Sequence, residues 1–385
     1  MSAARRPGAA AALLAGTAAF LALSALAVAG PPPARGTSTV IRAGILREQE
    51  RVVIVSDRAI EVSAPSGRFV LDPAAYEVIA SPSGIEITGA GRVDAPVRLA
   101  PTGGARLHVA IRPYRGILEL RRTPAGRITV INELDLEEYL YGVLRMEVDP
   151  RWPPDALRAQ AVAARTLALY SLGRFAAEGY DVRATTESQV YGGVSAEDPR
   201  TTAAVEATRG QVLVFEGRPI FAAYHSDSGG HTEASELVWG GRYAYLRPVA
   251  DPYTVAQVWT LRLPLSALEE RLHRAGRGAS GVSAVDVAEV TSSGRAAYVR
   301  IATGAGALIV RGTELRTILG AEAMKSTLFT ARMLPGELPS VEFAGRGSGH
   351  GVGMSQWGAR GQALVGRGYA EILRYYYTGV TLEAR

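Results

Sequence analysis

The spacing of apolar residues changes abruptly near residue 135, and this change restricts the chain to folds that combine a sheet with packed helices. From Ile41 to about Leu120, short β-rich runs alternate with Gly, Pro, Ser and Asp, which predicts antiparallel strands in a small sheet. These runs lie at 52–55, 60–62, 69–71, 85–87 and 107–109, and strand-like character continues at 128–131. Beyond them the apolar spacing becomes helical.

Two helices are predicted next. The first covers Asp135 to about Glu147, because Asp135 and Glu138 have the spacing of a capping box and precede an apolar stripe. The stripe consists of Leu136, Tyr139, Leu140, Val143 and Leu144. Prolines at 150, 153 and 154 end this helix and begin the second, which is predicted from about Pro154 to Phe175. Its many alanines allow another element to approach closely.

The remainder of the chain mixes both kinds of element. Strands are predicted at 212–215 and 220–224, and residues 259–334 alternate strand-like runs with short helices such as 265–271. A glycine-rich loop and one or two helices end the sequence. We therefore expect an α+β fold. It has a β-rich region at 31–125, then an α+β region at 126–385 with a central helix pair, a Gly-rich C-terminal loop-helix motif and a smaller α/β subdomain at 258–340.

The first thirty residues have the pattern of an export signal. Two arginines precede an apolar run from Ala9 to Ala29, and residues 27–29 offer a small-residue cleavage site. The run also reaches the roughly 20 residues that span a bilayer. A cleaved signal peptide and a retained membrane anchor therefore both fit. In either case we expect the protein to be exported, with membrane contact only through this segment.

Composition excludes several classes of function. The chain has no cysteine, which rules out disulfides, thiolate metal sites and thiol nucleophiles. Its 42 basic and 37 acidic residues leave a formal charge of +5. This excess is spread along the chain without a basic helix face, so we expect no nucleic-acid partner, whereas a polyanionic wall or membrane surface suits it.

Glu147 is the main candidate for chemistry. It follows Leu136 by three helical turns and so returns to the apolar stripe, at a helix end where the dipole disfavours negative charge. Desolvation there would raise its pKa, as a general acid requires. The alternative is a solvated carboxylate at a frayed helix end. Arg158 and Arg165 share a face of the second helix and would bind substrate or orient the acid, or would simply be solvated. An arginine touching Glu147 would lower its pKa instead.

Two polar turns and a group of aromatic residues supply further candidates. His225 and His231 lie in a turn with nearby acids, but the zinc motif HExxH is absent, so a polar ligand is favoured and zinc remains the lesser alternative. Gly alternates with other residues from 345 to 353, which allows positive φ and presents His350. A dinucleotide site is disfavoured because too little chain follows. Trp357 and the tyrosines at 375–377 offer either flat faces for sugar rings or core packing.

Several segments, in order, resemble the stage II sporulation protein D and amidase-enhancer family. Residues 136–147, LEEYLYGVLRME, look like the family's helix that ends in its catalytic glutamate, and 157–166, LRAQAVAART, look like the helix that follows. Residues 189–193 and 225–233 resemble segments of its substrate cleft. The most specific signature is GSGHGVGMSQWGA at 347–359. The resemblance extends from about residue 128 to 381.

This resemblance implies a lytic transglycosylase that cuts peptidoglycan glycan strands, preferably strands stripped of peptides, between N-acetylmuramic acid and N-acetylglucosamine. Glu147 would be the catalytic acid/base, and no second carboxylate is needed if the sugar's own hydroxyl attacks and gives an anhydro-sugar. The implied substrate-binding residues are Arg158, Arg165, Tyr191, His225, Ser228, His350 and Gln356. Some members bind zinc through a histidine and cysteines near the segment aligned with His225; this chain lacks the cysteines, so we expect no metal cofactor.

Two other functions remain open. The chain would be a non-catalytic peptidoglycan-binding or amidase-activating protein if it bound glycan without cleaving it, and a cell-wall amidase would then be a partner. It would be a zinc peptidase or amidase if His225 and His231 held a metal. Nothing in the sequence ties the protein to spore formation rather than to division or general wall turnover.

Overall fold

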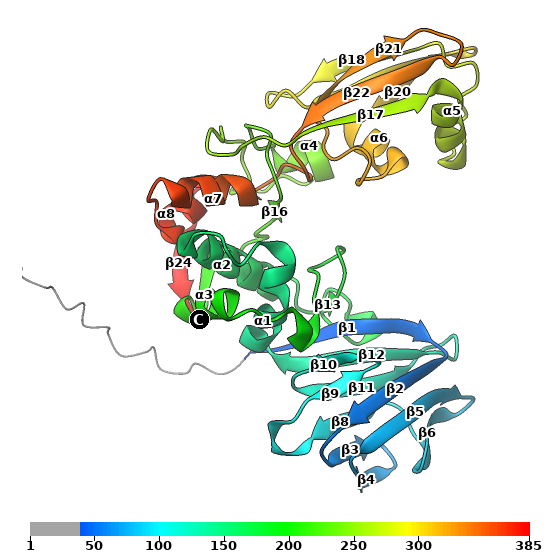
Figure 1. Ribbon diagram of the computed structural model, residues 1–385, viewed down its shortest axis with the longest axis vertical. Helices are drawn as coiled ribbons and strands as arrows, with labels where there is room; N and C mark the ends of the chain where they lie inside the picture. Colours follow the sequence, from blue (N-terminus) through cyan, green and yellow to red (C-terminus); the bar gives the residue numbers. More distant parts are fainter. Residues whose placement is uncertain (1–38) are drawn as a thin grey trace, which may run out of the picture. The chain divides into compact units, whose positions relative to one another are not determined.

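The computed structural model describes residues 39–385, which combine helices and strands in the predicted α+β fold (Figure 1). The predicted export segment, residues 1–30, lies outside the described residues. None of the helices in the described part is both long and apolar enough to cross a membrane.

A seven-stranded sheet forms the first layer, in the order β13-β1-β12-β11-β8-β3-β4. The strands are β1 (Val40–Gln49), β3 (Ile60–Ala64), β4 (Gly67–Leu71), β8 (Val97–Pro101), β11 (Ile117–Arg122), β12 (Ile128–Asp135) and β13 (Val182–Arg183). All neighbours are antiparallel except β1 and β13, which are parallel. This sheet takes strands from both sides of the region boundary expected near residue 125.

A six-stranded antiparallel sheet in the order β10-β9-β2-β5-β6-β7 forms the second layer. Its strands are β2 (Arg51–Ser56), β5 (Ala74–Ser81), β6 (Gly84–Ile87), β7 (Gly91–Val93), β9 (Leu107–Val109) and β10 (Arg112–Tyr114). Every second residue of β2 is buried, as expected for a strand with one face on a core. One apolar cluster joins the two sheets to helices α1 and α2, so the β-rich region supports the helix pair directly.

The central helix pair consists of α1 (Leu136–Glu147) and α2 (Pro154–Tyr170). The side chain of Asp135 accepts hydrogen bonds from the backbone N–H groups of Glu137 at 2.8 Å and Glu138 at 3.4 Å, which confirms the predicted N-cap. Helix α2 is shorter than predicted, because Gly173 has a φ of 74° and turns the chain. Its buried alanines let α1, α3 (Pro199–Ala207), α7 (Gln356–Leu364) and α8 (Tyr369–Tyr376) pack around it.

Two small sheets connect this helical layer to distant parts of the sequence. Strand β14 (Gln211–Phe215) pairs with β15 (Arg218–Pro219) and with β24 (Thr381–Ala384), and β16 (Tyr224–His225) pairs in parallel with β23 (Met354–Ser355). The prediction of a strand at 220–224 was wrong except for Tyr224. The carbonyl of Ala223 accepts from the Tyr377 hydroxyl and the Met354 N–H, so the preceding segment lies in an apolar cluster rather than in a ladder.

Residues 258–346 enclose an apolar cluster of their own. One three-stranded sheet contains β17 (Val258–Pro264), β22 (Ser340–Arg346) and β21 (Phe329–Leu334), and the other contains β18 (Ala284–Val290), β19 (Ala296–Thr303) and β20 (Gly306–Arg311). Helices α5 (Leu265–Arg274) and α6 (Gly312–Leu319) complete this part, and α4 (Ser235–Trp239) precedes it. The 3-10 helices are η1 (Thr102–Gly104), η2 (Ala176–Glu178) and η3 (Gly193–Ala196).

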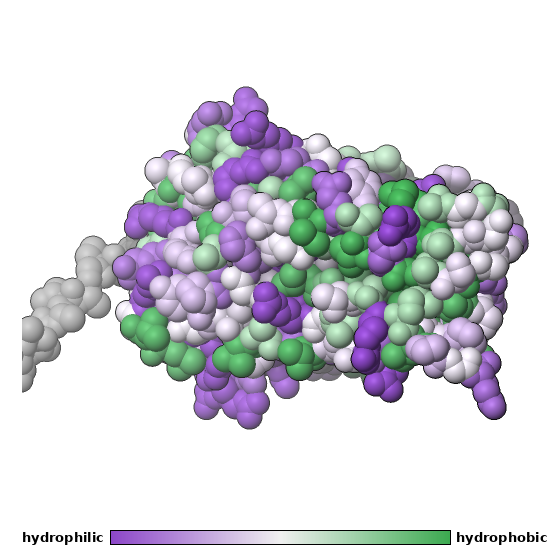
Figure 2. Space-filling view, turned by 90° about the horizontal axis from the view of Figure 1, so that it is seen from above, coloured by the Kyte–Doolittle hydropathy of each residue, from purple (hydrophilic) through white to green (hydrophobic). Residues whose placement is uncertain are grey.

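The large apolar side chains lie mainly in these three internal clusters. Those that are exposed come from separate elements, for example Ile111, Val258 and Leu364. On the face shown in Figure 2, apolar residues form small groups separated by hydrophilic ones. Scattered apolar residues of this kind are normal on a protein surface and do not by themselves mark a binding site.

Candidate active site around Glu147

Glu147 is the last residue of α1, and it is partly buried where three distant segments meet. Its carboxylate forms hydrogen bonds with the Tyr224 hydroxyl, the Gln356 side chain and the backbone N–H of Val190. Tyr224 lies on β16 and Gln356 begins α7, and the parallel pairing of β16 with β23 brings these two elements together. The site therefore depends on tertiary packing across more than half of the chain.

Hydrogen bonds behind Glu147 fix the orientation of Tyr224. The Gln189 side-chain amide donates to the Tyr224 hydroxyl oxygen at 3.2 Å and to the carbonyl of Ala164 at 3.2 Å. Because that oxygen already accepts a hydrogen bond, its own O–H is free to donate to Glu147. The site thus presents a set of donors to the carboxylate, held by α2 and by the 189–190 segment.

Burial raises the pKa of Glu147 to about 6, and the three hydrogen bonds oppose this rise without cancelling it. No arginine is among the groups that shift this pKa. Desolvation is therefore the dominant effect, as the apolar stripe indicated. A carboxyl group with a pKa near 6 exchanges a proton close to neutral pH, which suits a general acid/base.

The structure does not bring either predicted arginine to Glu147. Arg165 is 1% exposed and forms a bidentate ion pair with Glu137, with Nε–Oε1 and Nη2–Oε2 distances of 2.8 and 2.7 Å. Its remaining donors reach the carbonyls of Val205 and Gln211 at 3.1 Å. Arg158 instead pairs with Asp155 at the surface, at 3.3 Å. The two arginines share a helix face, but they are two turns apart, about 10 Å along the axis.

Tyr191 and Ser228 also have internal partners. The Tyr191 hydroxyl donates to the Asn132 side chain at 2.8 Å, and its ring packs 4.9 Å from the Tyr139 ring. A Cβ at Gly142 would come within 2.6 Å of the Tyr191 ring, so this glycine is needed for the close packing of α1. The Ser228 hydroxyl donates to Asp251 at 2.7 Å and is fully buried. Both residues stabilise the walls of the site.

His225 and His350 lie next to each other, with ring centroids 5.4 Å apart. His225 Nδ1 is 3.1 Å from the carbonyl of Val352, which can only accept, so Nδ1 carries the proton and Nε2 is an acceptor. His350 Nδ1 accepts from the N–H of Val352. Burial lowers the pKa of His350 to about 4 and holds the pKa of His225 well below its usual range. Both imidazoles are therefore neutral near pH 7.

The histidines do not fit a zinc site. Within residues 39–385, no three His, Asp or Glu side chains are grouped closely enough to hold a metal ion. The Nδ1 of His231 is engaged by the carbonyl of Thr232 at 2.9 Å. The chain also has no cysteine that could complete a set of zinc ligands.

The glycine-rich segment has the predicted backbone from Gly347 onward, whereas Gly345 is part of strand β22 and has no positive φ. Gly347, Gly349, Gly351 and Gly353 all have positive φ, between 71° and 109°. At Gly351 a Cβ would also lie 2.7 Å from the Arg295 guanidinium, so no other residue fits there. The segment places His350 beside His225 and then leads to Gln356, whose neighbour Ser355 caps α7 by accepting from the Gly358 N–H.

An aromatic pair lies beside the site, and of its two members Trp357 was predicted as a candidate face for sugar rings whereas Trp152 was missed. Trp152 follows α1 and Trp357 is next to Gln356; their ring centroids are 5.3 Å apart, and the Arg360 guanidinium lies 5.1 Å from the Trp357 ring. Both tryptophans are partly exposed. Tyr224 was also missed. Its neighbours in the sequence gave no signal for this role, because Tyr224 reaches Glu147 through the pairing of β16 with β23.

Comparisons with known proteins found two matching family models and several related proteins. A family model described as stage II sporulation protein matches residues 124–215, which include Glu147, and one described as a domain of unknown function matches residues 254–353. An uncharacterized protein of Brachyspira hyodysenteriae is 38% identical over 256 residues, which cover 66% of this chain and 68% of the relative. Stage II sporulation protein D of Bacillus subtilis is 31% identical over 268 residues, with 66% and 76% covered.

The amidase enhancer of Bacillus subtilis is 33% identical over 293 residues, which cover 64% of this chain. The match spans only 40% of that relative's length. The greater part of the amidase enhancer therefore has no counterpart in the alignment.

Proposed function

Because the chain belongs to the stage II sporulation protein D family, we propose that it is an exported lytic transglycosylase of the bacterial cell wall. Its substrate is the bond between N-acetylmuramic acid and N-acetylglucosamine in glycan strands, preferably peptide-stripped strands. The family's names support a role related to the cell wall, and the reaction is our inference. The observation that carries it is the partly buried Glu147, whose pKa is raised to about 6 among three hydrogen-bond donors.

The proposed reaction needs one carboxyl group. Protonated Glu147 gives its proton to the glycosidic oxygen as the bond from that oxygen to C1 of the muramic sugar breaks. The carboxylate then takes the proton of the sugar's C6 hydroxyl, whose oxygen forms a new bond to C1. The product is a 1,6-anhydro end, and Glu147 is protonated again without any water being consumed.

The donors around Glu147 suit both halves of this cycle. Desolvation favours the protonated acid before bond cleavage, and Tyr224, Gln356 and the Val190 N–H stabilise the carboxylate after it. The nearby carboxyl of Asp149 does not compete. It pairs with Arg151 at 2.6 Å, and this pairing lowers its pKa to about 2, so it is not an acid near neutral pH.

A pH profile tests the role of Glu147 as an acid. The free enzyme is active while Glu147 is protonated, so kcat/KM for glycan strands should fall about tenfold per pH unit above pH 6. In Tyr224→Phe the carboxylate loses a donor, its pKa rises, and the falling limb should move to higher pH. A profile that is flat between pH 5 and about 8, or that rises through pH 6, would contradict the assignment.

The Trp152–Trp357 pair offers a flat apolar surface for the face of a sugar ring beside Glu147. We expect Trp357→Ala to raise KM for glycan strands about fivefold, with a smaller change in kcat, since stacking is worth roughly 1 kcal/mol. The matched control is Leu364→Ala on the same helix, where the side chain is 60% exposed. Steady-state kinetics check this, and an unchanged KM in Trp357→Ala would remove the pair from the binding site.

A second function is favoured by one observation, the 33% identity to a protein named amidase enhancer. Incubating wild-type protein with peptide-stripped and intact peptidoglycan, with and without a cell-wall amidase, separates the two functions. Soluble glycan fragments released by wild-type protein alone support the transglycosylase. The amidase-activating function would be established instead by two results together. Wild-type protein and Glu147→Gln would speed the amidase equally, and wild-type protein would release no glycan fragments.

A further inference from the structure

A second group of aromatic residues reaches the surface between the end of α2 and α4. Phe221 lies at its centre, and its ring centroid is 5.3 Å from that of Tyr170, 5.4 Å from Trp239 and 5.6 Å from Tyr243. Tyr170 is 44% exposed and Trp239 is 42% exposed. These four residues are called the distal aromatic group below. The reaction proposed above uses none of them.

The distal aromatic group is connected to the active site through His350. The ring centroids of Trp239 and His350 are 4.9 Å apart. The His350 ring forms a hydrogen bond with the backbone of Tyr224, and the hydroxyl of Tyr224 bonds to Glu147. Two side chains therefore separate Trp239 from the proposed acid. The group is continuous with the candidate active site and is not an isolated apolar patch.

Helix α2 separates the distal aromatic group from the Trp152–Trp357 pair. Trp152 lies two residues before the first residue of this helix, and Tyr170 is its last residue. A helix of 17 residues is about 25 Å long. The two aromatic groups therefore lie near opposite ends of α2.

Glu147 lies between these two ends. Its partner Gln356 is 3.5 Å from the side chain of Gln160, and the amide that donates to the Tyr224 hydroxyl also donates to the carbonyl of Ala164 at 3.2 Å. Gln160 and Ala164 belong to the middle turns of α2. A chain of sugar rings that contacted both aromatic groups would thus pass the proposed acid.

The backbone around Trp239 is held in place before any ligand binds. Gly240 has a φ of 80° and ends α4, with its N–H donating to the carbonyl of Glu236 at 3.1 Å. The N–H of Tyr243 donates to the hydroxyl of Ser235 at 3.0 Å, which ties the following turn back to the start of the same helix. A surface that is already ordered loses little conformational entropy on binding.

We propose that the distal aromatic group binds sugar rings of the same glycan strand that is cut at Glu147. This proposal rests on the proposed function, because it takes the glycan strand as the substrate. A sugar ring has an apolar face that stacks on an aromatic side chain and hydroxyls at its rim that need polar partners. The Tyr170 and Tyr243 hydroxyls bond to each other and can also donate to or accept from such hydroxyls. The protein would then hold a strand on both sides of the bond to be cut.

The test measures the binding of long, peptide-stripped glycan strands by isothermal titration calorimetry. Every protein carries Glu147→Gln, so that the strands are not cut. Trp239→Ala should weaken binding about fivefold, the usual effect of losing one stacking contact. Trp239→Phe keeps an aromatic ring and should bind within about twofold of the parent protein.

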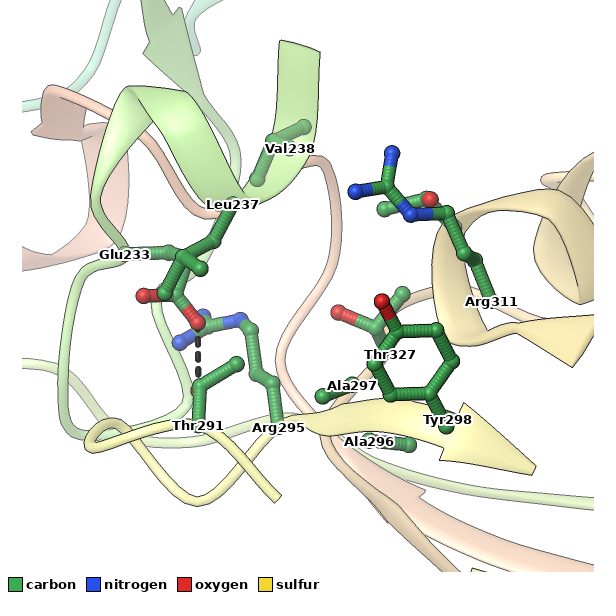
Figure 3. Close-up of a pocket in the computed structure, with 11 residues that line it drawn as sticks. Glu233, Leu237, Val238, Thr291, Arg295, Ala296, Ala297, Tyr298, Arg311 and Thr327 are labelled. Atoms are coloured by element: carbon green, nitrogen blue, oxygen red, sulfur yellow. Dashed lines mark hydrogen bonds between the residues drawn. The ribbon is translucent and has the colours of Figure 1, made fainter. Parts of the chain in front are cut away.

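The matched control is Leu237→Ala on the same helix, which should bind strands as the parent protein does. Leu237 is 45% exposed, close to the value for Trp239. Its side chain lines a separate pocket between α4 and β19 (Figure 3). Residues two positions apart on a helix do not face each other, so Leu237 and Trp239 are on different faces of α4.

The double variant Trp239→Ala/Trp357→Ala tests whether one strand contacts both groups. Contacts with a single bound strand contribute independently, so the two losses should multiply to about 25-fold. Two groups that held separate strands would not show this product, because each would keep its own affinity after the other was removed.

Two results would overturn this proposal and leave the proposed function intact, provided that wild-type protein cleaves strands. One is equal binding by Trp239→Ala and Leu237→Ala, and the other is a double variant that binds no more weakly than Trp357→Ala alone. If Trp239→Ala bound strands normally but lost the stimulation of a cell-wall amidase, the surface would instead be a protein interface. An absence of strand binding by the parent protein would contradict this proposal and the proposed function together. Trp239 is exposed, so these results do not depend on a folding defect.

Discussion

Glu147→Gln should lower the rate of glycan cleavage by about three to four orders of magnitude, because the amide can neither donate the proton nor take it back. The substitution keeps the shape of the side chain and an oxygen that accepts from the Val190 N–H and the Tyr224 hydroxyl. Folding and strand binding should therefore be close to those of wild type. The measurement is the initial rate at which soluble fragments appear from peptide-stripped glycan strands.

The matched control for this prediction is Glu138→Gln on the same helix. Glu138 lies in the first turn of α1 and pairs with Arg115 at 3.5 Å, with its side chain 37% exposed. Its substitution should leave the cleavage rate within about threefold of wild type, as an exposed ion pair contributes little. If Glu147→Gln retained more than about a tenth of the activity, another group would have to be the acid.

The second large effect concerns the stability of the helix pair. Arg165→Leu should lower the free energy of unfolding by about 3–5 kcal/mol, because it leaves the carboxylate of Glu137 buried without a counter-charge. The side chain of Glu137 is 9% exposed. Once Arg165 is replaced, the Gly210 N–H at 3.1 Å is the one donor within residues 39–385 that still bonds to the Glu137 carboxylate. Urea denaturation measures this loss.

Two comparisons make the stability prediction specific. Arg158→Leu breaks the surface pair with Asp155 and should cost less than about 1 kcal/mol. The double variant Arg165→Leu/Glu137→Leu removes both charges and should recover part of the loss of the single variant. Equal stabilities of Arg165→Leu and Arg158→Leu would contradict the distinction that the structure draws between these two arginines.

Local signals were sufficient to predict the helix that carries Glu147. The capping residue Asp135, the apolar stripe and the proline after Asp149 defined α1 closely, and they placed the carboxyl group at the end of a buried face. The glycine alternation likewise predicted the positive φ values of the glycines at 347, 349, 351 and 353. Each of these features depends on neighbours in the sequence, and for that reason one sequence was enough.

The parts that could not be predicted depend on contacts between distant segments. Tyr224 reaches Glu147 only because β16 pairs with β23 from the other end of the chain. Helical spacing placed Arg165 and Arg158 on one face of α2. It could not show that Glu137 of α1 would form an ion pair with Arg165. Residues 220–223 have the apolar composition of a strand, but the segment is not part of a sheet, and its side chains pack in an internal apolar cluster. Apolar periodicity reports burial, and it does not identify the partner.

The most direct test of the proposed reaction is the mass of its products in water labelled with heavy oxygen. Wild-type protein incubated with peptide-stripped glycan strands should release fragments whose muramic ends are lighter by one water than those of a hydrolase and carry no label, because the C6 hydroxyl attacks in place of water. Heavier, labelled ends would identify a hydrolase and contradict the single-carboxyl mechanism. No fragments despite strand binding would leave this chain as a binding or amidase-activating member of its family.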